Sequence, residues 1–195
     1  MTATQILGRE HHSMLMVVEA CQNFAEDLKA GKKIPATALQ NIVDFFRVYG
    51  NLRHHREEQW LLSLLKEKDL VSDGCPIDVL REEHQKIMAL VEELAKAVSL
   101  CAKSDGAVVN GVAETLHSLA DRYSSHIWKE DNILLPFADQ SLSVVEQQRL
   151  AEVFYMVTSG REEDAARAQE QVSESIRDWE RSENNDKRSR WLAAL

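Results

Sequence analysis

The sequence predicts an all-α protein, specifically an antiparallel up-down-up-down four-helix bundle with additional C-terminal helices. Helix-breaking residues are scarce, with 7 Gly and 3 Pro among 195 residues, and this composition favours long helices over strands and turns. Between the breakers, apolar residues recur at the i, i+3, i+4, i+7 spacing of a helix with one buried face. The connections between the first four segments are short, which places consecutive helices antiparallel.

Four helical segments make up the predicted bundle. The first ends before Gly31 and Pro35, and turns are expected at Ser72–Pro76 and Ser104–Gly106. Pro136 lies near the end of the fourth segment. The four helices are therefore expected at about 4–30, 36–69, 77–103 and 107–138.

Two further helices are predicted after the bundle. Ser143 and Glu146 have the spacing of a capping box, in which the serine caps the helix amides and the glutamate reaches back. The stretch from Glu162 to about Ser182 carries a sparser apolar stripe, which indicates an outer helix that lies across the bundle or forms an interface. We expect residues 1–140 to form the bundle and residues 141–195 a helical extension that packs on it.

Composition argues against several classes of protein. The net charge of −9 would repel a nucleic-acid backbone, and no apolar run is long enough to cross a bilayer. The N-terminus shows no basic region followed by an apolar stretch, so no secretory signal is visible. Three widely spaced cysteines indicate neither a disulfide framework nor a zinc cluster. The cytoplasm is the expected location.

Each of the first four helices places one histidine on the apolar stripe that should face the core. These histidines are His11, His54, His84 and His126. A single histidine on such a stripe is usually a hydrogen-bonded core residue. However, His54 and His126 are each followed four residues later by a glutamate, Glu58 and Glu130. Side chains at i and i+4 share one helix face, so each imidazole and carboxylate should converge.

Bound cations give these glutamates a common explanation. A carboxylate in an apolar core costs several kcal/mol unless it is paired or binds a metal. Imidazole and carboxylate together suit iron, manganese or zinc. Half of the histidines would lie on each of two metals, and Glu58 and Glu130 could bridge them. The alternative, buried His–Glu ion pairs that cross-link the helices, is costly without a metal.

Several neighbouring residues could support the ligands without binding a metal. Glu57 and Asp131 lie next to the two ligand glutamates and could hydrogen-bond to ligands. Tyr123 is one turn before His126 and either donates a hydrogen bond towards the site or fills the core.

Three other histidines are expected outside the ligand set. His12 and His55 follow proposed ligands directly, so they point about 100° away and should lie at the surface or support a ligand. His117 falls on the face opposite to His126 and should contact solvent.

The order His, His-x-x-x-Glu, His, His-x-x-x-Glu on four successive helices resembles the hemerythrin-like, or HHE cation-binding, family. The resemblance covers about residues 4–140. The matching stretches are Arg9–Leu15, His54–Leu62, Arg81–Met88 and His126–Pro136.

The resemblance implies a bundle that holds two iron ions with a bridging oxo or hydroxo group. The implied ligands are His11, His54, Glu58, His84, His126 and Glu130. Oxygen-carrying members have an additional histidine one turn after the third-helix ligand, and here that position is Met88. Because a thioether is a poor ligand for a hard iron site, one iron would keep an open or water-filled position.

These observations predict a di-iron protein that binds or reacts with oxygen, peroxide or nitric oxide. Its role would be oxygen sensing, oxygen storage, or protection against oxidative or nitrosative stress. We expect no nucleic-acid or membrane partner, and the outer helix would allow a homodimer. The alternatives are an iron-handling or iron-sensing regulatory module without redox turnover and a structural bundle without a metal. Manganese and zinc are the alternative ions.

Overall fold

The computed structural model describes residues 1–70, 77–101, 106–160 and 162–193. These ranges are helical apart from short connections and contain no strand, which confirms the all-α class. The predicted turn at 72–76 and residues 104–105 of the second predicted turn lie outside the described residues.

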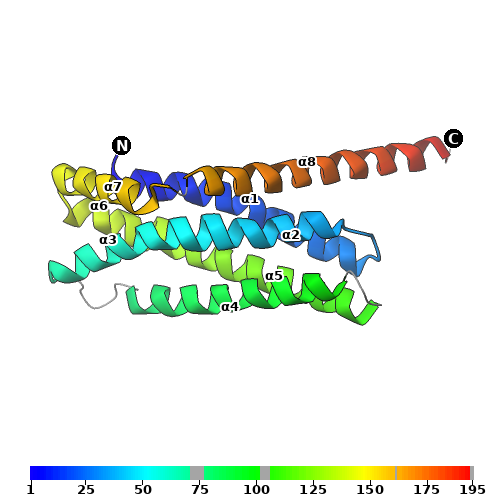
Figure 1. Cartoon of the computed structure of the whole chain (residues 1–195), viewed down its shortest axis with the longest axis horizontal. Helices are drawn as coiled ribbons and strands as arrows, with labels where there is room; N and C mark the ends of the chain where they lie inside the picture. The colour runs from blue at the N-terminus through cyan, green and yellow to red at the C-terminus, as the bar shows by residue number, and fades with distance from the viewer. Residues whose placement is uncertain (71–76, 102–105, 161, 194–195) are drawn as a thin grey trace.

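Four long helical segments lie side by side along the molecule, and consecutive segments run in alternating directions (Figure 1). The first is α1 (Ala3–Lys29), and the third is α4 (Ile77–Cys101). The second comprises α2 (Ala36–Phe45), η1 (Phe46–His54) and α3 (His55–Glu67). The fourth comprises α5 (Gly106–Lys129), η2 (Glu130–Leu134) and α6 (Leu135–Ser141).

The second and fourth segments each contain a π-helical stretch, η1 and η2. The amide of His55 donates to the carbonyl of Gly50, and the amide of Leu135 donates to that of Glu130, in each case five residues back. The sequence predicts uninterrupted helices here, because apolar periodicity does not distinguish a π turn inside an α-helix. Such turns are rare and occur frequently at functional sites.

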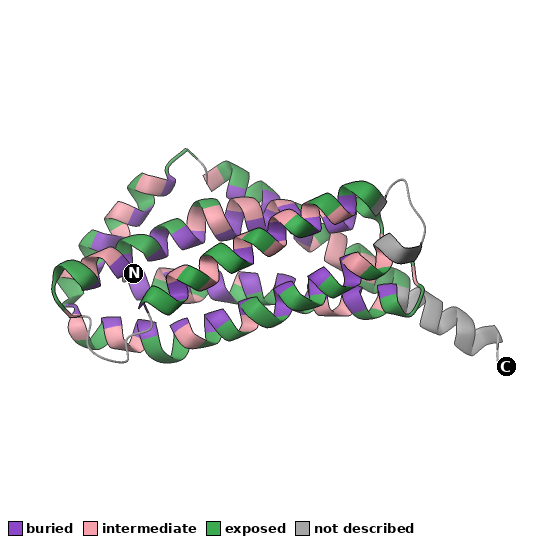
Figure 2. Cartoon of the chain, turned by 90° about the horizontal axis from the view of Figure 1, so that it is seen from below, coloured by how far each residue is buried: buried purple, intermediate pink, exposed green. Residues whose placement is uncertain are grey.

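The core consists of two apolar clusters, one towards each end of the bundle. One contains Met14, Phe46 and Ile87, and the other contains Leu7 and Leu61. In each bundle helix the candidate ligands lie in sequence between members of the two clusters. The buried faces of the helices point inwards along the whole bundle (Figure 2), so the candidate ligands form a polar layer between two apolar halves.

Two more helices, α7 (Val144–Thr158) and α8 (Glu162–Ala193), follow the bundle. The predicted capping box of Ser143 and Glu146 is present at the start of α7. The indole of Trp179 in α8 donates to Asp27 of α1 at 3.0 Å, and its ring meets that of Phe24 edge-on at 5.2 Å. Helix α8 therefore lies against the bundle, although the division at residues 140 and 141 stays a prediction.

Within the described ranges, no helix is both long enough and apolar enough to span a bilayer.

Candidate metal centre

All six predicted ligands come together in the polar layer of the bundle. Five of them are buried, and the His84 side chain is 15% exposed. Each is contributed by a different element: His11 by α1, His54 by η1, Glu58 by α3, His84 by α4, His126 by α5 and Glu130 by η2.

The six residues form two groups whose candidate ligand atoms lie within 4.8 Å of one another. The first group is His11, His54 and Glu130, and the second is Glu58, His84, His126 and Glu130. The first two helical segments thus supply one pair of histidines, and the last two supply the other. Glu130 belongs to both groups.

The carboxylate of Glu130 lies between the two histidine pairs. Its Oε2 is 2.9 Å from Nε2 of His11 and 3.8 Å from Nε2 of His54. Its Oε1 is 2.8 Å from Nε2 of His126 and 3.8 Å from Nε2 of His84. One oxygen on each side is the arrangement by which a carboxylate bridges two cations.

Glu58 lies on one side only. Its Oε2 is 2.8 Å from Nε2 of His84, and it belongs to the second group alone. The prediction that Glu58 also bridges therefore has less geometric support than the same prediction for Glu130.

The donor atoms fit a pair of cations. Among the described residues, Nε2 of all four histidines and both oxygens of Glu58 and Glu130 are buried without a hydrogen-bond partner, because even their close approaches lack hydrogen-bond geometry. Buried polar atoms are almost always satisfied. Nitrogen and carboxylate oxygen are ligands that iron, manganese and zinc accept together.

Three of the histidines are oriented by a carboxylate on Nδ1. His11 faces Asp131 at 2.6 Å, His54 faces Glu10 at 3.0 Å, and His126 faces Glu83 at 3.1 Å. Each of these Nδ1 contacts leaves Nε2 of the same ring directed at the site. Such carboxylates fix the tautomer and ring orientation of metal-binding histidines.

Asp131, a candidate supporting residue in the sequence, lies against His11, whereas Glu10 and Glu83 were not predicted. Both directly precede a candidate ligand, in the pairs Glu10-His11 and Glu83-His84. Each reaches the histidine of the neighbouring segment instead of its own, as the contacts with His54 and His126 show. The repeated Glu-His pair was the available signal.

Glu57 lies next to residues that contact a candidate ligand. It is buried, and its carboxylate is 3.7 Å from Arg53, which also contacts Glu10 at 2.6 Å. Burial and the nearby charge of Glu10 raise the pKa of Glu57 to about 8. Glu57 is linked to His54 through Glu10 and Arg53.

Tyr123 and Met88 differ in their surroundings. Tyr123 is fully buried and stacks on Phe46 at 4.5 Å between ring centroids. Its hydroxyl has no hydrogen-bond partner among the described residues, so the tyrosine fills the core and also keeps a free polar group there. Met88 lines a cleft together with His84.

His55, expected at the surface or in support of a ligand, lies directly beside a candidate ligand. It is buried, its ring stacks on that of His84 at 4.0 Å, and it forms a third candidate group with His84 and His126. The π turn that ends at His54 changes the side-chain directions, so the angle of an ideal α-helix does not apply here. His12 is exposed, and so is His117, which lies 3.6 Å from Asp121.

The protonation of the cluster is set by its own charges. Burial disfavours the charged form of His54 and of His84, but the carboxylates facing them outweigh it and raise their pKa values to about 10 and about 9. Burial also opposes ionisation of Glu130, yet His126 and its neighbours hold the pKa of Glu130 well below the ordinary value. Burial, together with the charge of His84, lowers the pKa of His55. Cations would displace protons from the charged imidazoles.

Comparison with known families identifies the class of protein. Residues 2–138 match the family described as the hemerythrin HHE cation binding domain. This match covers most of the chain, and the chain belongs to that family.

Three uncharacterized mycobacterial proteins are similar to this chain. One is from Mycobacterium bovis and two are from strains of Mycobacterium tuberculosis. Each is 25% identical over 154 residues, which cover 78% of this chain and 60% of the relative. The chain thus spans less than two thirds of these relatives. No solved structure matches it significantly.

Proposed function

We propose that the chain is a non-haem di-iron protein that binds or reacts with oxygen or a related small ligand, such as peroxide or nitric oxide. The observation that carries this proposal is the position of Glu130, whose two oxygens each face one pair of histidines. The family assignment supports a cation site, and the chemistry of the donors favours iron over a soft metal.

Each group of residues has a distinct role in this proposal. His11 and His54 hold one ion, His84, His126 and Glu58 hold the other, and Glu130 lies between them. Two bound iron ions would supply one-electron redox chemistry and a position for the small ligand.

The protein around the ions orients the imidazoles and limits access to them. Asp131, Glu10 and Glu83 hold three imidazole rings so that Nε2 faces the ions. His84 is the most exposed of the six and lines a cleft, so a small ligand would enter on its side. Uncharged His55 beside His84 can donate or accept a hydrogen bond there.

The first test is the metal content and absorption spectrum of protein purified without chelator. We expect about two irons per chain, and charge-transfer bands in air that bleach after anaerobic reduction. His54→Ala and Glu130→Ala should each lower the iron content. His117→Ala is the matched control, because His117 is exposed and belongs to neither group.

Three outcomes would contradict the proposal or change it. A colourless protein that holds zinc, or no metal, would exclude the redox function. Equal losses of iron in all three variants would mean that the two groups are not the binding site. Bound iron that protects the protein from unfolding without any reaction with oxygen would favour an iron-sensing module.

A further inference from the structure

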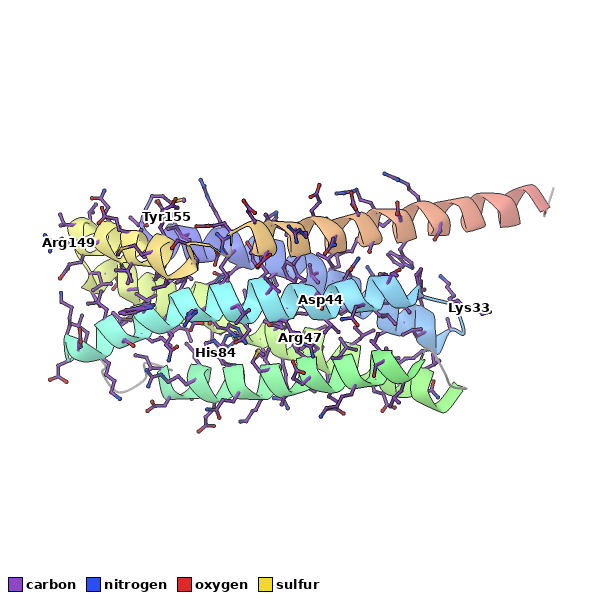
Figure 3. The ribbon with its side chains drawn as sticks, in the orientation of Figure 1. Lys33, Asp44, Arg47, His84, Arg149 and Tyr155 are labelled. Carbon is purple, nitrogen blue, oxygen red and sulfur yellow. The ribbon has the colours of Figure 1, made fainter. Side chains whose placement is uncertain are left out.

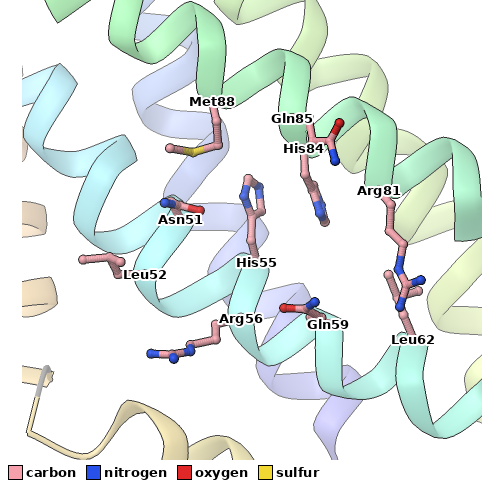
Figure 4. Close-up of a pocket in the computed structure, with 10 residues that line it drawn as sticks. All are labelled: Asn51, Leu52, His55, Arg56, Gln59, Leu62, Arg81, His84, Gln85 and Met88. Carbon is pink, nitrogen blue, oxygen red and sulfur yellow. The ribbon is translucent and has the colours of Figure 1, made fainter.

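A cleft lies over the second group of candidate ligands, between α4 and the η1–α3 segment. It has a volume of about 900 Å³, and His55, His84 and Met88 line it. Figure 4 shows both imidazole rings near the middle of this α3–α4 cleft. A water molecule occupies only about 30 Å³ in the liquid, so the cleft is much larger than a diatomic ligand requires. Its volume is typical of sites for small organic molecules.

The lining of the α3–α4 cleft is positive in a chain whose net charge is −9. Arg56 and Arg81 line it, and no described Asp or Glu does. In Figure 4 the two arginines lie on opposite sides of the imidazoles. The remaining polar lining consists of the amide side chains of Asn51, Gln59 and Gln85. Guanidinium groups with additional neutral donors are suited to a carboxylate.

Other arginines of the same helical segment are neutralised. Arg47 donates to Glu92 through two nitrogens, at 2.8 and 2.6 Å, and Arg53 is 2.6 Å from Glu10. In the part of the chain that the structure describes, neither Arg56 nor Arg81 forms an ion pair, and the buried Nε of Arg81 has no hydrogen-bond partner. The cleft therefore holds positive charge that an anion could balance.

His55 adds a buried polar group that faces the same space. The residue is 6% exposed and lines the cleft, and neither of its ring nitrogens has a hydrogen-bond partner among the described residues. A neutral imidazole can donate through one of these nitrogens. A ligand in the cleft would satisfy a group that the protein leaves unpaired.

We propose that the α3–α4 cleft binds a small organic carboxylate. Arg56 and Arg81 hold the carboxylate against His55 and His84. The bound ligand covers the side on which His84 is exposed and so controls the access of smaller molecules. This position beside the iron rests on the proposed function, whereas the charge of the cleft does not depend on a metal.

The test is calorimetric titration of the full-length protein with acetate, succinate and citrate, and with succinamide as an uncharged analogue. We expect at least one carboxylate to bind and succinamide not to bind. Arg56→Gln and Arg81→Gln should each weaken binding about tenfold or more, because charge-assisted hydrogen bonds are lost. Arg149→Gln should leave it unchanged, since Arg149 is exposed on α7, far from His84 (Figure 3).

The outcomes separate this proposal from the proposed function. No binding of any carboxylate at millimolar concentration, or equal weakening in Arg149→Gln, would overturn the cleft proposal. Iron content is measured on the same preparations. Iron-free protein that binds a carboxylate would contradict the di-iron function and leave the cleft proposal standing. Iron-loaded protein that binds none would contradict only the cleft proposal.

Discussion

At the scale of single residues, several candidate ligands are oriented by carboxylates that lie outside the two ligand groups. His11 is held between Asp131 at Nδ1 and Glu130 at Nε2. The Nδ1 contact selects the tautomer that leaves a lone pair on Nε2 for a metal. Removing such a contact weakens metal binding without removing a ligand.

Asp131→Ala should therefore lower iron affinity by about 10- to 100-fold. The fold should persist, because the Asp131 side chain is 39% exposed. Competition with a chelator of known affinity measures the effect. Asp121→Ala is the control on the same segment, since Asp121 lies 3.6 Å from the exposed His117 and belongs to no candidate ligand group among the described residues. An unchanged affinity in Asp131→Ala would show that the contact does not support a ligand.

The positions of the six candidate ligands could be anticipated from the sequence, because each lies on the apolar stripe of its helix and two pairs have i+4 spacing. The same reasoning did not place His55 inside the cluster. Its direction depends on a π turn, and no residue pattern in a single sequence identifies that turn reliably. Glu10 was missed for another reason, since it reaches across to His54 of a neighbouring helix.

At the scale of elements, η1 fits against α5 with little spare room. Gly50 of η1 faces the Tyr123 hydroxyl, and a Cβ at residue 50 would lie 2.9 Å from that oxygen. The Tyr123 side chain cannot move away easily from an added Cβ, because it is fully buried and stacks on Phe46. The absent side chain at Gly50 therefore allows the two elements to approach.

Gly50→Ala should lower the free energy of unfolding by about 1–3 kcal/mol through overpacking. In a Tyr123→Phe background the same change should cost much less, because the clashing oxygen is gone. Chemical denaturation of the two single variants and the double variant measures this coupling. Gly111→Ala in α5 is the control: no described residue lies within 4 Å of its added Cβ, and the change should be neutral or stabilising by about 1 kcal/mol. If the free-energy costs of the two single changes simply add in the double variant, the Tyr123 hydroxyl does not clash with the Cβ added at residue 50.

At this scale the limits of the helices could be predicted from the sequence, whereas the π-helical stretches within them could not. Observed α1 and α4 begin and end within two residues of the expected limits. Capping residues and helix breakers define those limits locally. The stretches η1 and η2 are determined instead by packing across the bundle. The order of apolar residues in the sequence does not reveal this packing directly.

At the scale of the whole molecule, the two apolar halves are joined through a layer of buried charge. Buried carboxylates and imidazoles that only face one another contribute little net stability. Cations that bind the folded state and not the unfolded chain would stabilise it. The bundle should consequently be most stable when cations are bound at its centre.

Removal of metal by a chelator should lower the melting temperature. At metal concentrations about a thousandfold above the dissociation constant, the loss corresponds to roughly 4 kcal/mol. Differential scanning calorimetry of loaded and stripped protein measures it. Glu130→Ala should melt at the same temperature with and without chelator, because it lacks the residue that both groups share. Equal melting temperatures in the unmodified protein would show that metal does not stabilise the fold.

The two π turns have a consequence for how this chain can vary in evolution. One residue lost from Phe46–His54 would turn everything beyond it by about 100° relative to the preceding helix, and would separate His54 from the group that it forms with His11 and Glu130. The exposed residue of η1, Leu52, can change identity, whereas the number of residues in η1 is fixed. We expect relatives with the same centre to tolerate insertions and deletions in the connections between helices and to keep the spacing within these two stretches.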